Sequence, residues 1–147
     1  MFSKILVCSD GSPKALEAAR DAAQLARKFG SEVVLLSVFD PSVVPAATLG
    51  IPGGVLETTV NSGCYADETQ TAVEHETGKM FQEAGVQFRA RRELGHPVDR
   101  IISSAHDEAV DLIVIGSRGI GGYERLLLGS VSEGVLRHAH CPVLAVR

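Results

Sequence analysis

The chain has 147 residues, of which 45% are hydrophobic and 22% are charged, and its formal net charge is −4. This length and composition predict one globular domain over residues 1–147. The acidic balance excludes nucleic acid and an anionic membrane as preferred partners, because both reward a basic surface. We find neither an apolar run of the roughly 20 residues that span a bilayer nor a secretory signal. The three widely spaced cysteines are typical of reduced thiols, so we expect a cytoplasmic protein.

The first part of the chain predicts a strand, a helix and a second strand. Lys4–Cys8 is a short apolar run that ends in polar turn residues, as a buried strand does. Ser12 stands before a proline, which is typical of a helix start, and Gly30 is typical of a helix end. We therefore predict a helix over Pro13–Phe29, whose many alanines indicate a close approach to a sheet. The apolar run Glu32–Phe39 predicts the next strand and completes a βαβ unit.

The middle of the chain is less regular. Residues 40–66 combine prolines and glycines with apolar residues, so we predict a long loop that is a lid, a binding loop or a locally disordered segment. Helical character returns over Asp67–Ala84. Val86–Glu93 alternates apolar and polar residues, which predicts a half-exposed strand at the edge of the sheet.

The last third alternates helices and strands again. Pro97 opens a predicted helix, Leu112–Ile115 is a buried strand, Ser130 begins a further helix and Val143–Val146 is the last strand. Strict alternation along the chain predicts an α/β fold, in which a parallel sheet carries helices on both faces.

A glycine-rich loop separates the strand Leu112–Ile115 from the helix that begins at Ser130. Glycines let a backbone approach a ligand closely, and a helix N-terminus offers free N–H groups, so this order predicts a phosphate cradle. Arg118 inside the loop could add a charge-assisted contact, or it could be a solvated surface charge. In the alternative interpretation, the glycines only end a strand and shape a turn. They are Gly116, Gly119, Gly121, Gly122 and, directly before Ser130, Gly129.

The ends of the first two strands supply further candidates, because open parallel sheets bind ligands outside the carboxyl ends of their strands. Ser9 and Asp10 follow the first strand, and Val38 lies late in the second. The Asp10 carboxylate could accept hydrogen bonds from ribose hydroxyls, or it could form an Asx-turn before the helix. The Val38 side chain is expected in the core whatever its backbone does.

Several other nucleotide-binding classes do not fit. The chain has no G-x4-G-K-(S/T) sequence, and its first strand is not followed by the dinucleotide-binding fingerprint. The run CSDGSPKA also lacks the clustered carboxylates of a receiver domain and the first loop of the pyrophosphatase-loop enzymes. His138, His140 and Cys141 could be imagined as metal ligands, but cationic residues are expected at a helix end, and we favour that structural interpretation.

The glycine spacing is more specific than any single glycine pair. Gly116-x2-Gly119-x9-Gly129-Ser130 resembles the G-x2-G-x9-G-(S/T) signature of ATP-binding universal stress proteins. KILVCSDGSPKALEAARDAAQLA resembles the opening strand and helix of that family, and HCPVLAVR resembles its closing strand. The resemblance covers essentially the whole chain. It implies a doubly wound, Rossmann-like, five-stranded parallel sheet of order 3-2-1-4-5.

The same resemblance implies an adenine-nucleotide site. It places Asp10 near adenine and ribose, and the backbone of Val38 at the adenine edge. The remaining candidates are expected to line the pocket floor, the ribose and the phosphates: Cys8, Ser9, Gly116, Arg118, Gly119, Gly121, Gly122, Gly129, Ser130, Val131 and Ser132.

The resemblance therefore implies a stress-response signalling or regulatory module that binds ATP or AMP, with Mg²⁺ as a candidate companion of the phosphates. It also implies a homodimer and an unidentified protein partner. The apolar strand Val143–Val146 gives the dimer a physical basis, because an unpaired apolar edge invites association. The alternative is a slow nucleotide hydrolase or nucleotidyl-transfer enzyme of the related adenine-nucleotide α-hydrolase-like fold, in which residues 40–66 close as a lid.

Overall fold

The computed structural model describes residues 1–43, 57–117 and 128–147, and for residues 57–64 it describes the helical backbone only. Its centre is a sheet in which every neighbouring pair of strands is parallel. The strand order is β3-β2-β1-β4-β5, as the resemblance implied. The strands are β1 (Lys4–Cys8), β2 (Glu32–Phe39), β3 (Phe88–Leu94), β4 (Leu112–Gly116) and β5 (Val143–Val146).

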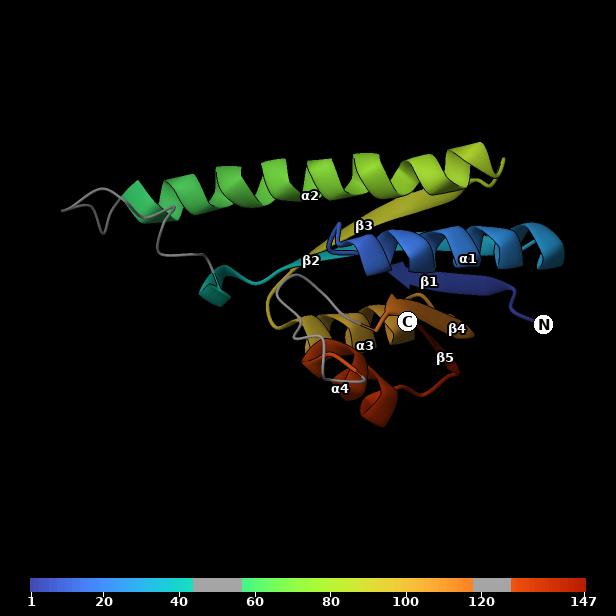
Figure 1. Cartoon of the computed structure of the whole chain (residues 1–147). Helices are drawn as coiled ribbons and strands as arrows, with labels where there is room; N and C mark the ends of the chain where they lie inside the picture. Colours follow the sequence, from blue (N-terminus) through green and yellow to red (C-terminus); the bar gives the residue numbers. More distant parts are fainter. Residues whose placement is uncertain (44–56, 118–127) are drawn as a thin grey trace.

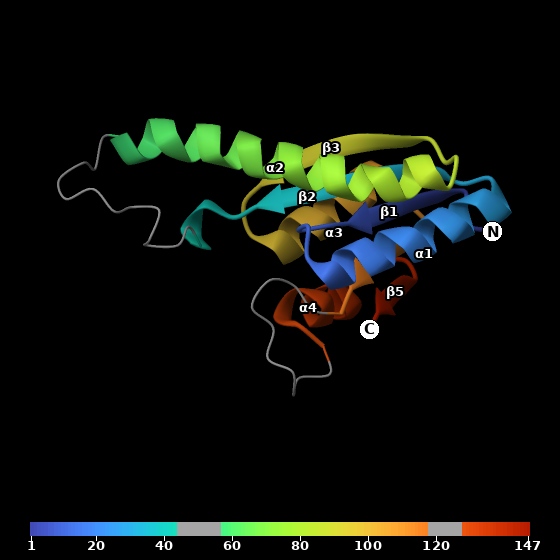
Figure 2. The same ribbon diagram turned by 45° about the horizontal axis from the view of Figure 1, so that its top comes forward.

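Helices cover both faces of the sheet, as the alternating pattern predicted (Figures 1 and 2). One face carries α1 (Pro13–Phe29) and α2 (Glu57–Glu83). The opposite face carries α3 (Pro97–Asp107) and α4 (Ser130–His138), and the short 3₁₀ turn η1 (Pro41–Val43) follows β2. Within the described ranges, every helix is too short or too polar to cross a membrane.

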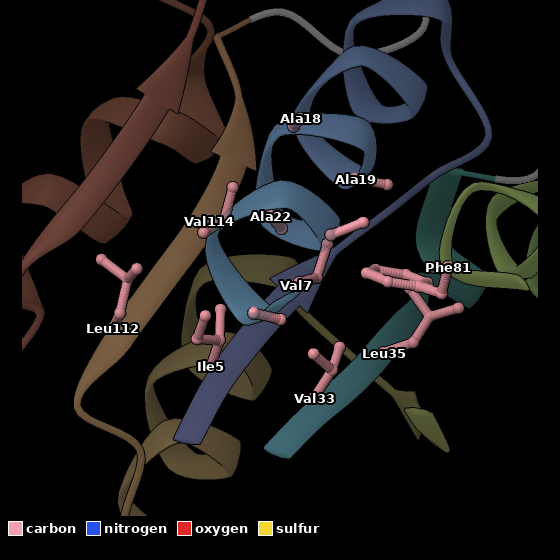
Figure 3. Close-up of a cluster of buried hydrophobic side chains, with 12 residues drawn as sticks. Ile5, Val7, Ala18, Ala19, Ala22, Val33, Leu35, Phe81, Leu112 and Val114 are labelled. Atoms are coloured by element: carbon pink, nitrogen blue, oxygen red, sulfur yellow. The ribbon is translucent and has the colours of Figure 1, made fainter. Parts of the chain in front are cut away.

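Local signals in the sequence set both ends of α1. The Ser12 hydroxyl accepts a hydrogen bond from the Ala15 N–H at 3.2 Å, and Gly30 ends the helix in the left-handed region at φ 69°. Only a glycine adopts that conformation without strain. The buried face of α1 consists of alanines, which let the helix lie close to β1 and β4 (Figure 3).

Side chains alternate between the two faces of the sheet, so each face has its own apolar core. Ile5 and Val7 of β1 point toward α1 and α2, where they meet Val33, Leu35 and Phe81 (Figure 3). Leu6 and Cys8 of the same strand point the other way. They pack with buried side chains of β2, α3, β4 and α4: Val34, Leu36, Ile101, Ala105, Ile113, Ile115 and Val135.

The predicted loop over residues 40–66 is wrong in its second half, because α2 begins at Glu57 and not at Asp67. The prolines and most of the glycines of that segment precede Glu57, and Gly63 is the only one of either type between Glu57 and Ala66. Extending an existing helix adds about one hydrogen bond per residue fixed, and a single interior glycine costs only about 1 kcal/mol. The helix therefore continues backward through a stretch of weak helix formers.

The strand β3 lies at the edge of the sheet, as its alternating pattern predicted. On the α3 side its charged side chains form ion pairs. Glu108 accepts a hydrogen bond from Arg89 at 2.6 Å and one from Arg91 at 3.1 Å, and Arg91 also bonds Glu93 at 2.9 Å. The Glu108 side chain is only 13% exposed. We call this group of residues (Arg89, Arg91, Glu93 and Glu108) the β3 charge cluster. It joins the edge strand β3 to the residue that follows α3.

The β3 charge cluster makes the free energy of unfolding depend on pH. The hydrogen bond from Arg89, followed by that from Arg91, lowers the pKa of Glu108 from 4.5 to about 2. A folded-state pKa below the unfolded value means that the stabilisation is complete above about pH 4.5 and is lost as the pH falls toward 2. We expect the free-energy difference of unfolding between wild type and Glu108→Gln to shrink by about 2 kcal/mol between about pH 5 and pH 3. Urea denaturation at both pH values measures it, and a constant difference would contradict the prediction.

Candidate functional site

The turn after β1 presents Asp10 at the carboxyl end of the sheet. The Ser9 N–H donates to the Leu36 carbonyl at 3.0 Å, which continues the β1–β2 ladder by one residue. The exposed Asp10 then accepts a hydrogen bond from the Ser12 N–H through Oδ1 at 2.9 Å, and Gly11 takes φ 78°. This is the Asx-turn of the alternative interpretation. Such a turn fixes the carboxylate at the start of α1, so it also orients the group.

Cys8 and Ser9 lie beneath this turn and point to opposite faces. The Cys8 side chain is 6% exposed and packs in the core on the α3 and α4 side. Burial raises the pKa of the Cys8 thiol far above its ordinary value, so the sulfur stays protonated at neutral pH and is a poor nucleophile. The Ser9 hydroxyl points toward α2 and bonds Thr77.

Gly116 brings the end of β4 against the first turn of α1. A Cβ atom at this position would stand 2.8 Å from the Lys14 carbonyl carbon and 2.9 Å from the Ala15 nitrogen. Only a residue without a side chain allows the two backbones to approach this closely. The glycine thus joins the Asp10 turn, through α1, to the segment that leads toward α4.

Hydrogen bonds tie the start of α4 to the end of β4. The Gly129 N–H donates to the Ser117 carbonyl at 2.6 Å, and the Ser132 hydroxyl donates to the Gly116 carbonyl at 2.8 Å. The Ser117 N–H in turn donates to the Val146 carbonyl of β5 at 2.7 Å. The first turn of α4 is therefore held beside the carboxyl end of β4.

The first turn of α4 has no side-chain cap, because its N-cap residue is Gly129. The intrahelical bonds begin with the Glu133 N–H, which donates to the Gly129 carbonyl at 3.0 Å. The geometry of a helix leaves the three preceding N–H groups, from Ser130 to Ser132, without intrahelical acceptors. Ser130 is exposed, Val131 is half-buried, and the Ser132 side chain is buried on Gly116. An anion would fit here, because the helix dipole adds to these N–H groups.

Val38 lies near the end of β2, opposite Glu93 of β3. Its side chain is half-buried and packs against the core on the α3 and α4 side, which agrees with the expectation of a core side chain. Four candidates of the glycine loop, Arg118, Gly119, Gly121 and Gly122, lie outside the described residues.

The structure brings several predicted residues together at one end of the sheet. Gly116, Gly129 and Ser132 are joined by hydrogen bonds, and the Asp10 turn approaches Gly116 through the first turn of α1. Sequence reasoning did not single out Ser117, which is 2% exposed and links Gly129 to β5. Its position directly after the last strand residue was the available signal. Gly11, whose positive φ allows the turn around Asp10, was likewise not singled out.

Histidine, cysteine and carboxylate side chains do not gather into a metal site within the described ranges, where no group of three or more could hold an ion. His138 Nδ1 lies 2.8 Å from the Gly134 carbonyl of its own helix. The rings of His140 and His106 meet edge to face at 5.9 Å. His138 and His140 therefore each have a contact within the fold.

Comparison with known proteins decides the family. The model of the universal stress protein family matches residues 1–147. The chain belongs to the universal stress protein family. A universal stress protein of Methanocaldococcus jannaschii is 38% identical over 148 residues, which cover 100% of this chain and 83% of the relative. A universal stress protein of Bacillus subtilis is 35% identical over 154 residues and covers 100% of both chains.

Solved structures of universal stress proteins share the fold. The protein UspA from Lactobacillus plantarum superposes with a TM-score of 0.81 at 24% identity, over 99% of this chain and 98% of the other. A universal stress protein described in complex with cAMP has a TM-score of 0.71 at 24% identity, over 99% and 97% of the two chains. The universal stress protein from Archaeoglobus fulgidus in complex with dAMP has a TM-score of 0.62 at 22% identity, over 100% and 98%.

Proposed function

We propose that this universal stress protein binds an adenine nucleotide, ATP or AMP, at the carboxyl ends of β1, β2 and β4. In this proposal the Asp10 carboxylate accepts hydrogen bonds from the ribose hydroxyls, and the backbone of Val38 meets the adenine edge. The phosphates lie at the start of α4, against the backbone of Gly129 and Ser130. Arg118, Gly119, Gly121 and Gly122 belong to the proposed site through the sequence signature alone.

The observation that carries the proposal is the position of the first turn of α4. Hydrogen bonds from Gly129 and Ser132 hold that turn beside β4, and among the described residues its N–H groups have neither a side-chain cap nor an intrahelical acceptor. A phosphate supplies the negative acceptor that such a helix end favours. The complexes of two universal stress proteins with cAMP and dAMP support an adenine nucleotide as the ligand class.

The proposed role is that of a cytoplasmic, nucleotide-dependent signalling module for the stress response, which acts through a protein partner. Mg²⁺ would enter with the phosphates of ATP, and Asp10 is the carboxylate that the proposal places nearest to them. We further propose a homodimer through β5. All four residues of that strand, Val143–Val146, are only half-buried in the single chain, although three of them are among the most apolar residue types.

Native mass spectrometry of the purified chain tests the proposed nucleotide binding and the proposed dimer in one measurement. We expect a mass of two chains with adenine nucleotide retained on each, and isothermal titration of nucleotide-free protein should give saturable binding of ATP or AMP. Binding of neither nucleotide would overturn the proposed function. A single-chain mass at micromolar concentration would overturn the dimer alone. A multiple-turnover ATPase assay separates the module from the hydrolase, because turnover near 1 per second or faster is typical of enzymes.

A further inference from the structure

Four buried polar side chains interrupt the apolar core beneath α2. Ile5 and Val7 of β1 point to this face and are followed by Ser9, and Val33 and Leu35 of β2 are followed in the same way by Ser37. From α2, Gln70 and Thr77 point down onto this region. The exposed fractions are 7% for Ser9, 2% for Ser37, 5% for Gln70 and 0% for Thr77. We call these four residues the α2 polar cluster.

Hydrogen bonds connect the α2 polar cluster to the strand ends. Thr77 Oγ1 lies 2.8 Å from Ser9 Oγ, and either hydroxyl can donate. Gln70 Nε2 donates to the carbonyls of Ser37 and Glu93, each at 3.1 Å, and so joins α2 to both β2 and β3. A buried hydrogen bond contributes only about 1 kcal/mol to stability, and replacing both partners by apolar groups of the same shape can be neutral or stabilising. A purely apolar interface would stabilise α2 at least as well, so the cluster suggests a role beyond packing.

The bond between Thr77 and Ser9 reaches the Asp10 turn. Ser9 Oγ also accepts a hydrogen bond from the Gly11 N–H at 3.2 Å, and this contact closes the turn around Asp10. One helical turn before Thr77, Val73 Cγ2 lies 3.3 Å from where a Cβ atom of Gly11 would stand. Two neighbouring residues of α2 therefore contact the turn that orients the Asp10 carboxylate.

We propose that Thr77 is a positioning residue of the nucleotide site: it fixes the Ser9 hydroxyl, which fixes the Gly11 N–H and thereby the Asp10 carboxylate. This inference rests on the proposed function and adds an element, α2, that the glycine signature does not include. Coupling of this kind is reciprocal, since a ligand that needs the ordered turn also stabilises the contact with α2. In this proposal, nucleotide binding therefore also stabilises the packing of α2, which lies on the opposite face of the sheet from α4.

The test compares three variants by isothermal titration with AMP and with adenosine. Thr77→Val keeps the shape of the side chain and removes the hydroxyl. We expect it to weaken binding about five- to tenfold, since one hydrogen bond contributes about 1 kcal/mol. The loss should be equal for both ligands, because Asp10 faces the ribose. Thr77→Ser restores the hydroxyl and should bind within about twofold of the wild type.

Phe81→Leu is the matched control for packing. Phe81 is fully buried one helical turn after Thr77 and contacts Phe88, and its apolar ring cannot hydrogen-bond to the Asp10 turn. It should lower the free energy of unfolding at least as much as Thr77→Val and leave the affinity unchanged. Equal affinities of Thr77→Val and wild type overturn the inference, and so does a similar loss in Phe81→Leu. In either case nucleotide binding by the wild type leaves the proposed function standing. A wild type that binds no nucleotide overturns both.

Discussion

Replacing Ser130 with aspartate is expected to stabilise the protein and to weaken nucleotide binding at the same time. Ser130 is the exposed first residue of α4. A carboxylate there interacts favourably with the positive end of the helix dipole, so we expect the free energy of unfolding to rise by about 0.3–1 kcal/mol. The same charge would stand next to the proposed phosphates, and two negative groups about 5 Å apart repel each other. Repulsion of that kind is on the order of 2–3 kcal/mol, which is a loss of about 30- to 150-fold in affinity for ATP.

Ser130→Asn is the matched control, because it has the shape of the aspartate variant without its charge. It should retain most of the affinity for ATP. Adenosine provides a second control, since it carries no phosphate and should bind the aspartate variant as it binds the wild type. The proposed location of the phosphates is wrong if Ser130→Asp and Ser130→Asn bind ATP equally well in titration calorimetry.

Gly116→Ala is expected to destabilise the fold strongly, by about 2–4 kcal/mol. The added Cβ would meet backbone atoms of Lys14 and Ala15 at 2.8 and 2.9 Å, and backbone atoms in a first helical turn cannot turn away as a flexible side chain can. Either α1 or the end of β4 has to move. Urea denaturation measures the loss, and the displaced turn should also lower the affinity for nucleotide.

Gly85→Ala is the comparison that separates crowding from backbone strain. Gly85 has φ 70° with no atom within 4 Å of an added Cβ, so its replacement is strained but not crowded. We expect it to cost only about 1 kcal/mol. A Gly116→Ala variant no less stable than Gly85→Ala would contradict the close approach of α1 and β4.

The fold was largely predictable, because short-range signals decide most of it. Ser12 before Pro13 and Gly30 after Phe29 mark the ends of α1, where the structure has them. The short, continuous apolar runs of β1, β2 and β4 predicted strands buried on both faces, and the structure has strands there. The start of α2 was not predictable in the same way. Residues 57–66 have little helical preference of their own, and the helix continues into them from its stable C-terminal part.

The candidate site was predictable only in its backbone positions. The glycine spacing marks Gly116, where the backbone of α1 leaves no room for a side chain, and Gly129, which is the N-cap residue of α4. Contacts between distant segments leave a weaker trace. Gln70 and Thr77 are polar, but they alternate along α2 with the apolar Val73 and Phe81. All four residues lie on the same buried face of the helix. A polar residue in such a position indicates a buried hydrogen-bond partner, but nothing in the sequence identifies Ser9 as that partner.

The β3 charge cluster also makes the two edges of the sheet unlike each other. An edge strand exposes unpaired backbone groups, and charged side chains along it discourage another strand from adding. β3 carries Arg89, Arg91, Arg92 and Glu93, whereas the opposite edge, β5, is the apolar sequence VLAV. If two chains join through β5, each combined sheet ends on both sides in a charged β3. Association through edge strands would then stop at the dimer, and open filaments of sheets joined edge to edge would be disfavoured.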